Sequence, residues 1–228
     1  MLWLRTRNSA HLTLSSVVLL LTMLVATPLL AANHQYADPW GDHGITVTRE
    51  DAGSVELSFS LENWYLGEIE IDGISRQTIQ VPGIWLPNEA GAPNVPGVGY
   101  HIAVPNGAKA SVRILDSRSE RFTNIDLGPA PEIPLETDDG LVYPKNDAIY
   151  SRDAFYPGNT FEQSAPLKVR GVDAIVLGLS PFQYNPVTQE LIVYHDLRLE
   201  VTFSGGGQTF GDDRLRSRWW DPILESLL

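Results

Sequence analysis

Few side chains in this chain have the types and spacing that catalysis needs, and the pair His195-Asp196 is the first candidate. A histidine oriented by a carboxylate can activate a serine hydroxyl. The pair lies inside the run from Glu190 to Phe203, where apolar residues recur at every second position. Because neighbouring side chains of a strand point to opposite faces, His195 and Asp196 are not expected to face each other. The alternation therefore predicts a core histidine on the apolar face and not a catalytic one.

The remaining nucleophile candidates form no coherent site. The 228 residues contain no cysteine, which excludes disulfides, thiolate metal sites and a cysteine nucleophile. The segment Gly178-Leu179-Ser180-Pro181 lacks the second glycine of a nucleophile elbow. We therefore expect this chain to have no catalytic activity of its own.

Acidic side chains and histidines are the candidate metal ligands of this chain. Carboxylate oxygens in a flexible loop are what Ca²⁺ prefers, and one irregular stretch carries four acids: Glu132, Glu136, Asp138 and Asp139. Their spacing matches no known calcium loop, so a solvated acidic loop is expected and calcium stays the alternative. Three further histidines, His34, His43 and His101, are scattered singly and do not suggest zinc. No metal and no other cofactor is expected.

The segments that carry these candidate residues are predicted to be mostly β-strands. Apolar residues recur with a period of two in most segments after residue 50, which predicts strands with one buried face. Turn signals separate the segments, including Asp72-Gly73, Pro105-Asn106-Gly107 and Asn185-Pro186. About ten short strands of this kind predict an all-β fold, an antiparallel β-sandwich or jelly roll. Residues 33–204 are long enough for one such domain.

The first 32 residues have the composition of a secretory signal peptide. Arg5 and Arg7 precede an apolar run from Leu12 to Leu30, and Ala31-Ala32 offers small residues for cleavage. An uncleaved anchor is the alternative, since the run could span a bilayer. After cleavage, no stable membrane insertion is expected. The chain has a formal charge of −12, and such an acidic chain is a poor candidate for binding nucleic acid.

Two segments resemble the propeptides of gingipain-type cysteine peptidases. The first runs from Tyr150 to Gly158 and the second from Pro181 to Thr188, and weaker similarity extends over roughly residues 80 to 204. The positions that match the family pattern are Tyr150, Asp153, Phe155, Pro157, Gly158, Pro181, Gln183, Tyr184, Asn185 and Pro186.

The resemblance implies a non-catalytic propeptide that assists folding and latency of a cysteine endopeptidase, which it would meet in cis or in trans. It also implies a secreted, periplasmic or cell-surface location in a bacterium. Residues 205–228 would then be a glycine-hinged linker towards a missing catalytic domain, in which processing is expected near Arg214, Arg216 or Arg218.

In this family a basic side chain from a loop is thought to occupy the specificity pocket of the peptidase. The corresponding loop here is Gly128 to Asn146, which is acidic and whose one basic residue is Lys145. Three alternatives stay open. Lys145 fills the pocket, or a peptidase of different preference receives an acidic residue (Glu136, Asp138 or Asp139), or latency needs no insertion.

A different class of function is a stand-alone secreted β-sandwich module for binding or adhesion. Trp64, Tyr65 and Trp85 could form a sugar-stacking platform, although tryptophans near strand ends are more often core or interface residues.

Overall fold

The computed structural model describes residues 32–51, 53–84, 89–136, 140–215 and 217–222. The predicted signal segment up to residue 31 therefore lies outside the described residues, and among those described no helix is long and apolar enough to cross a membrane. The elements are β1 (Ala32–Gln35), β2 (Gly44–Asp51), β3 (Ser54–Ser60), β4 (Asn63–Ile71), β5 (Ile74–Gln80), β6 (Val98–Val104), β7 (Lys109–Phe122), α1 (Asp147–Tyr150), β8 (Phe161–Gln163), β9 (Leu167–Val169), β10 (Val172–Leu179), β11 (Phe182–Asn185), β12 (Glu190–Ser204) and the 3₁₀ turn η1 (Asp213–Leu215).

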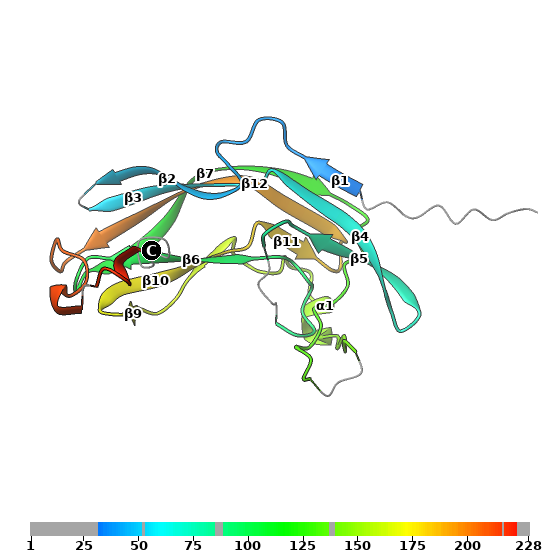
Figure 1. The fold of residues 1–228 in the computed structure, drawn as a ribbon. Helices are drawn as coiled ribbons and strands as arrows, with labels where there is room; N and C mark the ends of the chain where they lie inside the picture. Colours follow the sequence, from blue (N-terminus) through cyan, green and yellow to red (C-terminus); the bar gives the residue numbers. More distant parts are fainter. Residues whose placement is uncertain (1–31, 52, 85–88, 137–139, 216, 223–228) are drawn as a thin grey trace, which may run out of the picture.

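The strands form two facing layers, and every pair of named strands is antiparallel, which confirms the all-β prediction (Figure 1). One layer holds the sheet β11-β12-β3-β2, with β7 paired along β12, and continues into the sheet β1-β4-β5. The other layer is the sheet β6-β10-β8, with β9 paired to β10. Long β12 therefore joins β3, β7 and β11 in one sheet.

The core lies between the layers, where the predicted alternation places its apolar side chains. Leu197, Leu199 and Val201 of β12 are fully buried, as the period of two requires. They belong to one cluster with Leu57 and Phe59 of β3. Residues of β6 and β10 in the opposite layer complete it, namely Ile102, Val104, Ile175 and Leu177.

The hairpin between β11 and β12 forms as its sequence predicts. Asn185 Oδ1 accepts hydrogen bonds from the backbone N–H groups of Val187 and Thr188, at 3.0 and 3.3 Å. Pro186 occupies the next position, where its fixed φ suits the turn. β11 then pairs with β12 from Phe182↔Val193 to Asn185↔Glu190.

His195 departs from the predicted alternation. Tyr194 pairs with Ser119 and Asp196 pairs with Arg118, so the register between β12 and β7 skips His195. The extra residue makes a β-bulge, which disrupts the period of two. As a result His195 Nδ1 lies 2.9 Å from Asp196 Oδ2. The prediction that the two side chains do not face each other is therefore wrong.

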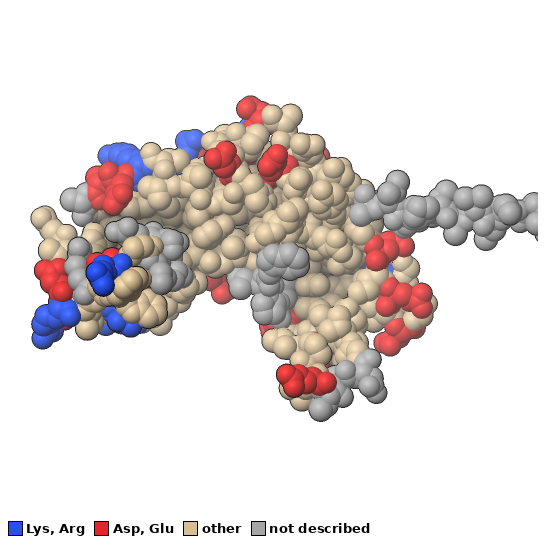
Figure 2. All heavy atoms as spheres, viewed as in Figure 1, with Lys and Arg blue, Asp and Glu red and all other residues tan. Residues whose placement is uncertain are grey.

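The charges of the chain are distributed unevenly over the surface. Figure 2 shows Asp and Glu side chains around the β4–β5 end and on the loop that projects near α1, with Lys and Arg at the opposite end. Glu68, Glu70 and Asp72, all exposed, lie on the β4–β5 hairpin. The β4–β5 end of this face is therefore acidic.

Candidate functional site

The loop of residues 131–145 projects from the body beside α1 (Figure 1), and Gly91 joins its two ends through backbone hydrogen bonds. Gly91 N donates a hydrogen bond to Ala130 O at 3.0 Å, and Asn146 N donates one to Gly91 O at 2.9 Å. Gly91 has φ +86°, and a Cβ there would lie 3.2 Å from Asn146 N. Only glycine combines this backbone conformation with so close an approach.

The loop carries exposed apolar side chains that the sequence analysis did not single out. Glu132 N donates to Val142 O at 2.8 Å, which holds the two arms of the loop together. Ile133 and Leu135 are 76% and 71% exposed, and Leu141 and Val142 are 52% and 58% exposed. Such a concentration of exposed apolar surface is typical of a protein-binding site.

The two segments that carry the family resemblance form the base of this loop. Tyr156 and Tyr184 exchange two backbone hydrogen bonds of 2.8 Å. Asn185 Nδ2 donates to Asp153 Oδ1 at 2.8 Å, and Gln183 Nε2 donates to Pro157 O at 2.8 Å. Residues some thirty positions apart in the sequence thus form one hydrogen-bonded unit. Within it Pro181 is buried, Phe155 and Pro157 are partly buried, and Gly158 is exposed.

Tyrosine hydroxyls tie this base to the segment that precedes the loop. Tyr184 Oη donates to Ile125 O at 2.8 Å, and Tyr150 Oη donates to Leu127 O at 3.1 Å. Burial raises the pKa of Tyr150 well above its ordinary value, and the neighbouring Tyr184 adds to this rise. Burial likewise raises the pKa of Tyr184. Both hydroxyls therefore stay protonated and available as donors at neutral pH.

The charged loop candidates are only partly brought together. Lys145 is exposed beside Asn146 at the base, and its Nζ lies 4.9 Å from the centre of the Tyr150 ring. Glu136 is exposed further out on the loop. Asp138 and Asp139 lie outside the described residues. Which side chain enters a peptidase pocket stays a prediction.

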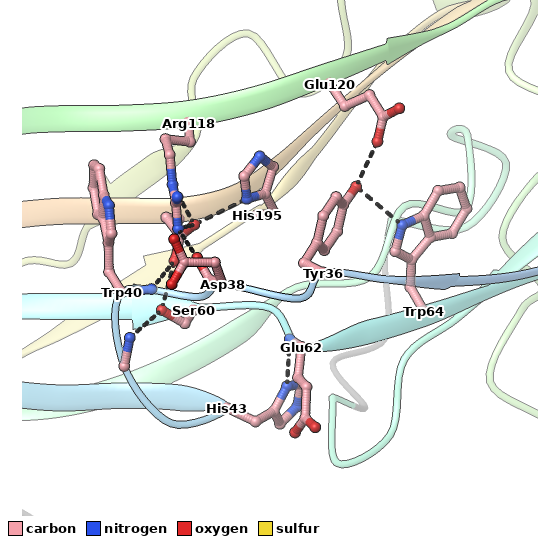
Figure 3. A network of polar contacts seen from close by, with 12 residues as sticks. Tyr36, Asp38, Trp40, His43, Ser60, Glu62, Trp64, Arg118, Glu120 and His195 are labelled. Atoms are coloured by element: carbon pink, nitrogen blue, oxygen red, sulfur yellow. Dashed lines mark hydrogen bonds and ion pairs between the residues drawn. The ribbon is translucent and has the colours of Figure 1, made fainter.

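A second polar site lies on the outer face of the five-stranded sheet, where the buried carboxylate of Asp196 gathers several donors. Oδ1 accepts from Trp40 N at 2.8 Å and from Ser60 Oγ at 2.7 Å, and Oδ2 accepts from Arg118 Nε at 2.8 Å (Figure 3). Burial alone would raise the pKa of Asp196, but these donors and His195 outweigh it and hold the pKa below its ordinary value. Asp196 is therefore a fully bonded anion.

The same network fastens the segment of residues 36–41 to the sheet. Arg118 also donates to the carbonyl of Asp38. The guanidinium groups of Arg118 and Arg198 lie 5.0 and 4.8 Å from the centre of the Trp40 ring. The ring of His195 stacks on Tyr36 at 4.2 Å, and Tyr36 is itself partly buried against the core. His195 is therefore a partner of the N-terminal segment, which corrects the prediction that places it on the apolar face.

Ser60, Asp196 and His195 are close together but in the wrong order for a catalytic triad. The serine must donate to the histidine, and the carboxylate must hold the other side of the ring. Here Ser60 Oγ donates to the carboxylate itself. The arrangement stabilises a buried charge and supplies no nucleophile.

Two of the three other candidate histidines, His34 and His43, have structural partners. His34 stacks on Trp64 at 4.2 Å, and His43 contacts Pro82 O through Nε2 and Glu62 N through Nδ1. Within the described ranges, no group of three or more His, Asp or Glu residues could hold a metal ion. The absence of calcium or any other cofactor stays a prediction.

Trp64 also argues against the sugar-stacking platform. Its side chain is fully buried and packs edge-to-face on Phe182, with ring centres 5.6 Å apart. Trp85, the other tryptophan of the predicted platform, lies outside the described residues. A buried ring cannot stack on a sugar, so Trp64 is a core residue.

Comparison with known proteins points to one family. The sequence model of the family Propeptide_C25 matches residues 38–214. Lys-gingipain of Porphyromonas gingivalis is 28% identical over 188 residues, which cover 79% of this chain and 11% of that protein. Gingipain R2 of the same species is 27% identical over 157 residues, covering 65% of this chain and 21% of that protein. The chain thus spans only a small part of these relatives.

Solved structures agree with the sequence comparison. A structure described as the complex of the RgpB pro- and mature domains of Porphyromonas gingivalis aligns with a TM-score of 0.70 at 20% identity, over 81% of this chain and 96% of that one. A structure concerned with zymogenic latency of gingipain K aligns with a TM-score of 0.64 at 25% identity, over 77% and 99% of the two chains. The sandwich is therefore the fold of these structures. With a match over more than half of its length, the chain belongs to the Propeptide_C25 family.

Proposed function

We propose that this chain is a non-catalytic propeptide that assists the folding of a gingipain-type cysteine endopeptidase and keeps it latent. Family membership supports the proposal, as do solved relatives described as a complex of pro- and mature domains and as a study of zymogenic latency. The absence of any cysteine from the chain is consistent with a partner that carries the nucleophile.

The observation that carries the proposal is the loop of residues 131–145 on its fixed base. The loop exposes apolar side chains, and Gly91 and the paired family segments hold its ends. A protruding segment with a preorganised base loses little conformational entropy when it enters a cleft. We infer that this loop contacts the peptidase, with Ile133 and Leu135 added to Lys145, Glu136, Asp138 and Asp139 as candidate contact residues.

The proposed function also requires that the chain be exported from the cytoplasm. Residues 1–32 have the composition of a signal peptide, and we infer that the chain is exported to the periplasm, the cell surface or the medium. N-terminal sequencing of the exported protein would give a start near residue 33. A protein that kept its first residues would contradict cleavage.

Inhibition of a mature peptidase tests the function directly. The exported chain is mixed with the mature gingipain-type peptidase encoded in the same genome, and with Lys-gingipain as a second probe. We expect inhibition with a Kd of about 1 µM or tighter for the peptidase from the same genome. Absence of inhibition, or thiol-dependent turnover by the chain alone, would contradict the proposal.

A further inference from the structure

The chain folds back on the body after β12, and the contact is made by one residue of the β6–β7 turn. Gly207 N donates to Asn106 O at 2.8 Å, and Asn106 N donates to Thr209 O at 2.9 Å. Asn106 Nδ2 donates to Gly211 O at 2.6 Å. The backbone and the side chain of Asn106 thus hold residues 207–211, within the segment predicted as a linker.

Glycines permit this close approach. Gly205 and Gly206 both have φ of +71°. A Cβ on Gly206 would lie 2.3 Å from Ala108 N, a distance that no side chain tolerates. Beyond the contact, a Cβ on Gly171 would lie 2.6 Å from Leu215 Cδ1, so the end of the Leu215 side chain, which is 46% exposed, touches the β9–β10 turn.

Arg214 follows the segment that Asn106 holds, three residues after Gly211. Its backbone N donates to Asp212 Oδ1 at 3.0 Å, and its guanidinium forms an ion pair with Asp212 Oδ2 at 2.6 Å. Leu215 N donates to Asp212 O at 2.8 Å, which closes a 3₁₀ turn over residues 213–215. A protease binds its substrate in an extended form, so cleavage after Arg214 requires this turn to open, while Asn106 holds the residues just before it, 207–211.

Arg218 lies in a different environment. Its side chain is exposed, as that of Arg214 also is, and the turn around it is closed by local hydrogen bonds such as Trp220 N to Ser217 O at 2.9 Å. The turn contacts the body through Trp220, whose ring centre lies 4.4 Å from the guanidinium of Arg170. This turn can open without disturbing Asn106.

We propose that the Asn106 contact makes residues 205–215 an integral part of the folded domain and directs trypsin-like processing to Arg218 in place of Arg214. The biological meaning rests on the proposed propeptide function, but the protection itself does not. Arg214 is then a latent site, cleaved only when the tail undocks.

Limited digestion with trypsin tests this inference without any partner peptidase. The exported chain carries Arg216→Gln in every sample, so that only the bonds after Arg214 and Arg218 are compared in this segment. The fragments are followed by mass spectrometry. We expect cleavage after Arg218 to be at least about tenfold faster than cleavage after Arg214. Equal rates at the two bonds would overturn the proposal.

Variants of the contact make the test specific. Asn106→Asp replaces the donor to Gly211 O by an acceptor, and Gly206→Ala blocks the close approach to Ala108. Each should speed cleavage after Arg214 about tenfold or more, while Asn159→Asp, the same change at an exposed position, should not. Cleavage after Arg198 in β12 reports global unfolding and should stay slow throughout. An unchanged Arg214 rate in both variants would overturn the proposal, whatever the inhibition assay shows.

Discussion

Arg118 Nε donates to Asp196 Oδ2 at 2.8 Å, and this pair joins β7, β12 and the N-terminal segment at one point. Asp196 is fully buried, whereas the Arg118 side chain is 33% exposed. A buried carboxylate with four donor residues is stable only while its donors are present. The pair therefore sets where the segment of residues 36–41 crosses the sheet.

Replacing Asp196 by Asn should destabilise the fold strongly. The amide keeps the shape, but its NH₂ group would face donors and the guanidinium of Arg118 would lose its counter-ion. We expect a loss of about 3 kcal/mol in the free energy of unfolding, measured by urea denaturation. Asp116→Asn, an exposed position on β7, is the matched control and should change it by less than about 0.5 kcal/mol. Equal losses would show that the network contributes nothing particular.

The same residue predicts a pH dependence of stability. The pKa of Asp196 is lower in the folded chain than the ordinary value of about 3.9 expected when unfolded. The folded state thus prefers the ionised carboxylate, so its contribution is complete above about pH 5 and is lost as the pH falls further. We expect the urea midpoint to drop between pH 5 and pH 3, with a smaller drop in Asp196→Asn. Parallel pH profiles of the two proteins would contradict this assignment.

The two faces of β12 can be compared by a matched pair of substitutions. Val201→Asp places an unpaired charge in the core and should cost several kcal/mol, enough to unfold an ordinary domain. Thr202→Asp lies on the opposite, partly exposed face and should cost less than about 1 kcal/mol. Equal melting temperatures would mean that the face is wrongly assigned. Arg198, expected from the sequence to tolerate the same change, is unsuitable because it stacks on Trp40.

Gly91→Ala should loosen the base of the projecting loop. At φ +86° and with a Cβ 3.2 Å from Asn146 N, alanine is both strained and crowded, at a cost of about 1–2 kcal/mol. Hydrogen exchange should become faster at Asn146 and in the adjacent loop. Gly83→Ala is the control, since it has φ +74° but nothing within 4 Å of the added Cβ. If Gly83→Ala speeds exchange in the loop as much, the crowding argument fails.

The loop side chains should differ in their effect on inhibition. If the exposed apolar residues anchor the contact, Leu135→Asp should weaken binding to the peptidase by about 2 kcal/mol or more. If Lys145 enters the pocket, Lys145→Ala should cause that loss. If an acidic residue does so, Glu136→Ala or Asp138→Ala should cause it while Lys145→Ala has no effect. Inhibition constants unchanged in all four variants would exclude insertion of the loop, though not the family assignment.

The strands of the core and the hairpin at Asn185-Pro186 could be predicted from the amino-acid sequence. Alternation and turn chemistry are local properties, so Leu197 and Val201 could be assigned to the buried face without coordinates. The family segments around Tyr150 and Tyr184 were also recognisable, because each is a short continuous motif.

Three features became visible only in the folded chain: the bulge at His195, the joining of the loop ends by Gly91 and the docking of the tail on Asn106. Each depends on a partner far away in the chain: Arg118 for the register at His195, Ala130 and Asn146 for Gly91, and Gly211 for Asn106. Periodicity carries no information about such distant contacts, since a bulge or a positive φ is stabilised by the residues that pack against it. The fold class was therefore predictable, while the geometry of the site was not.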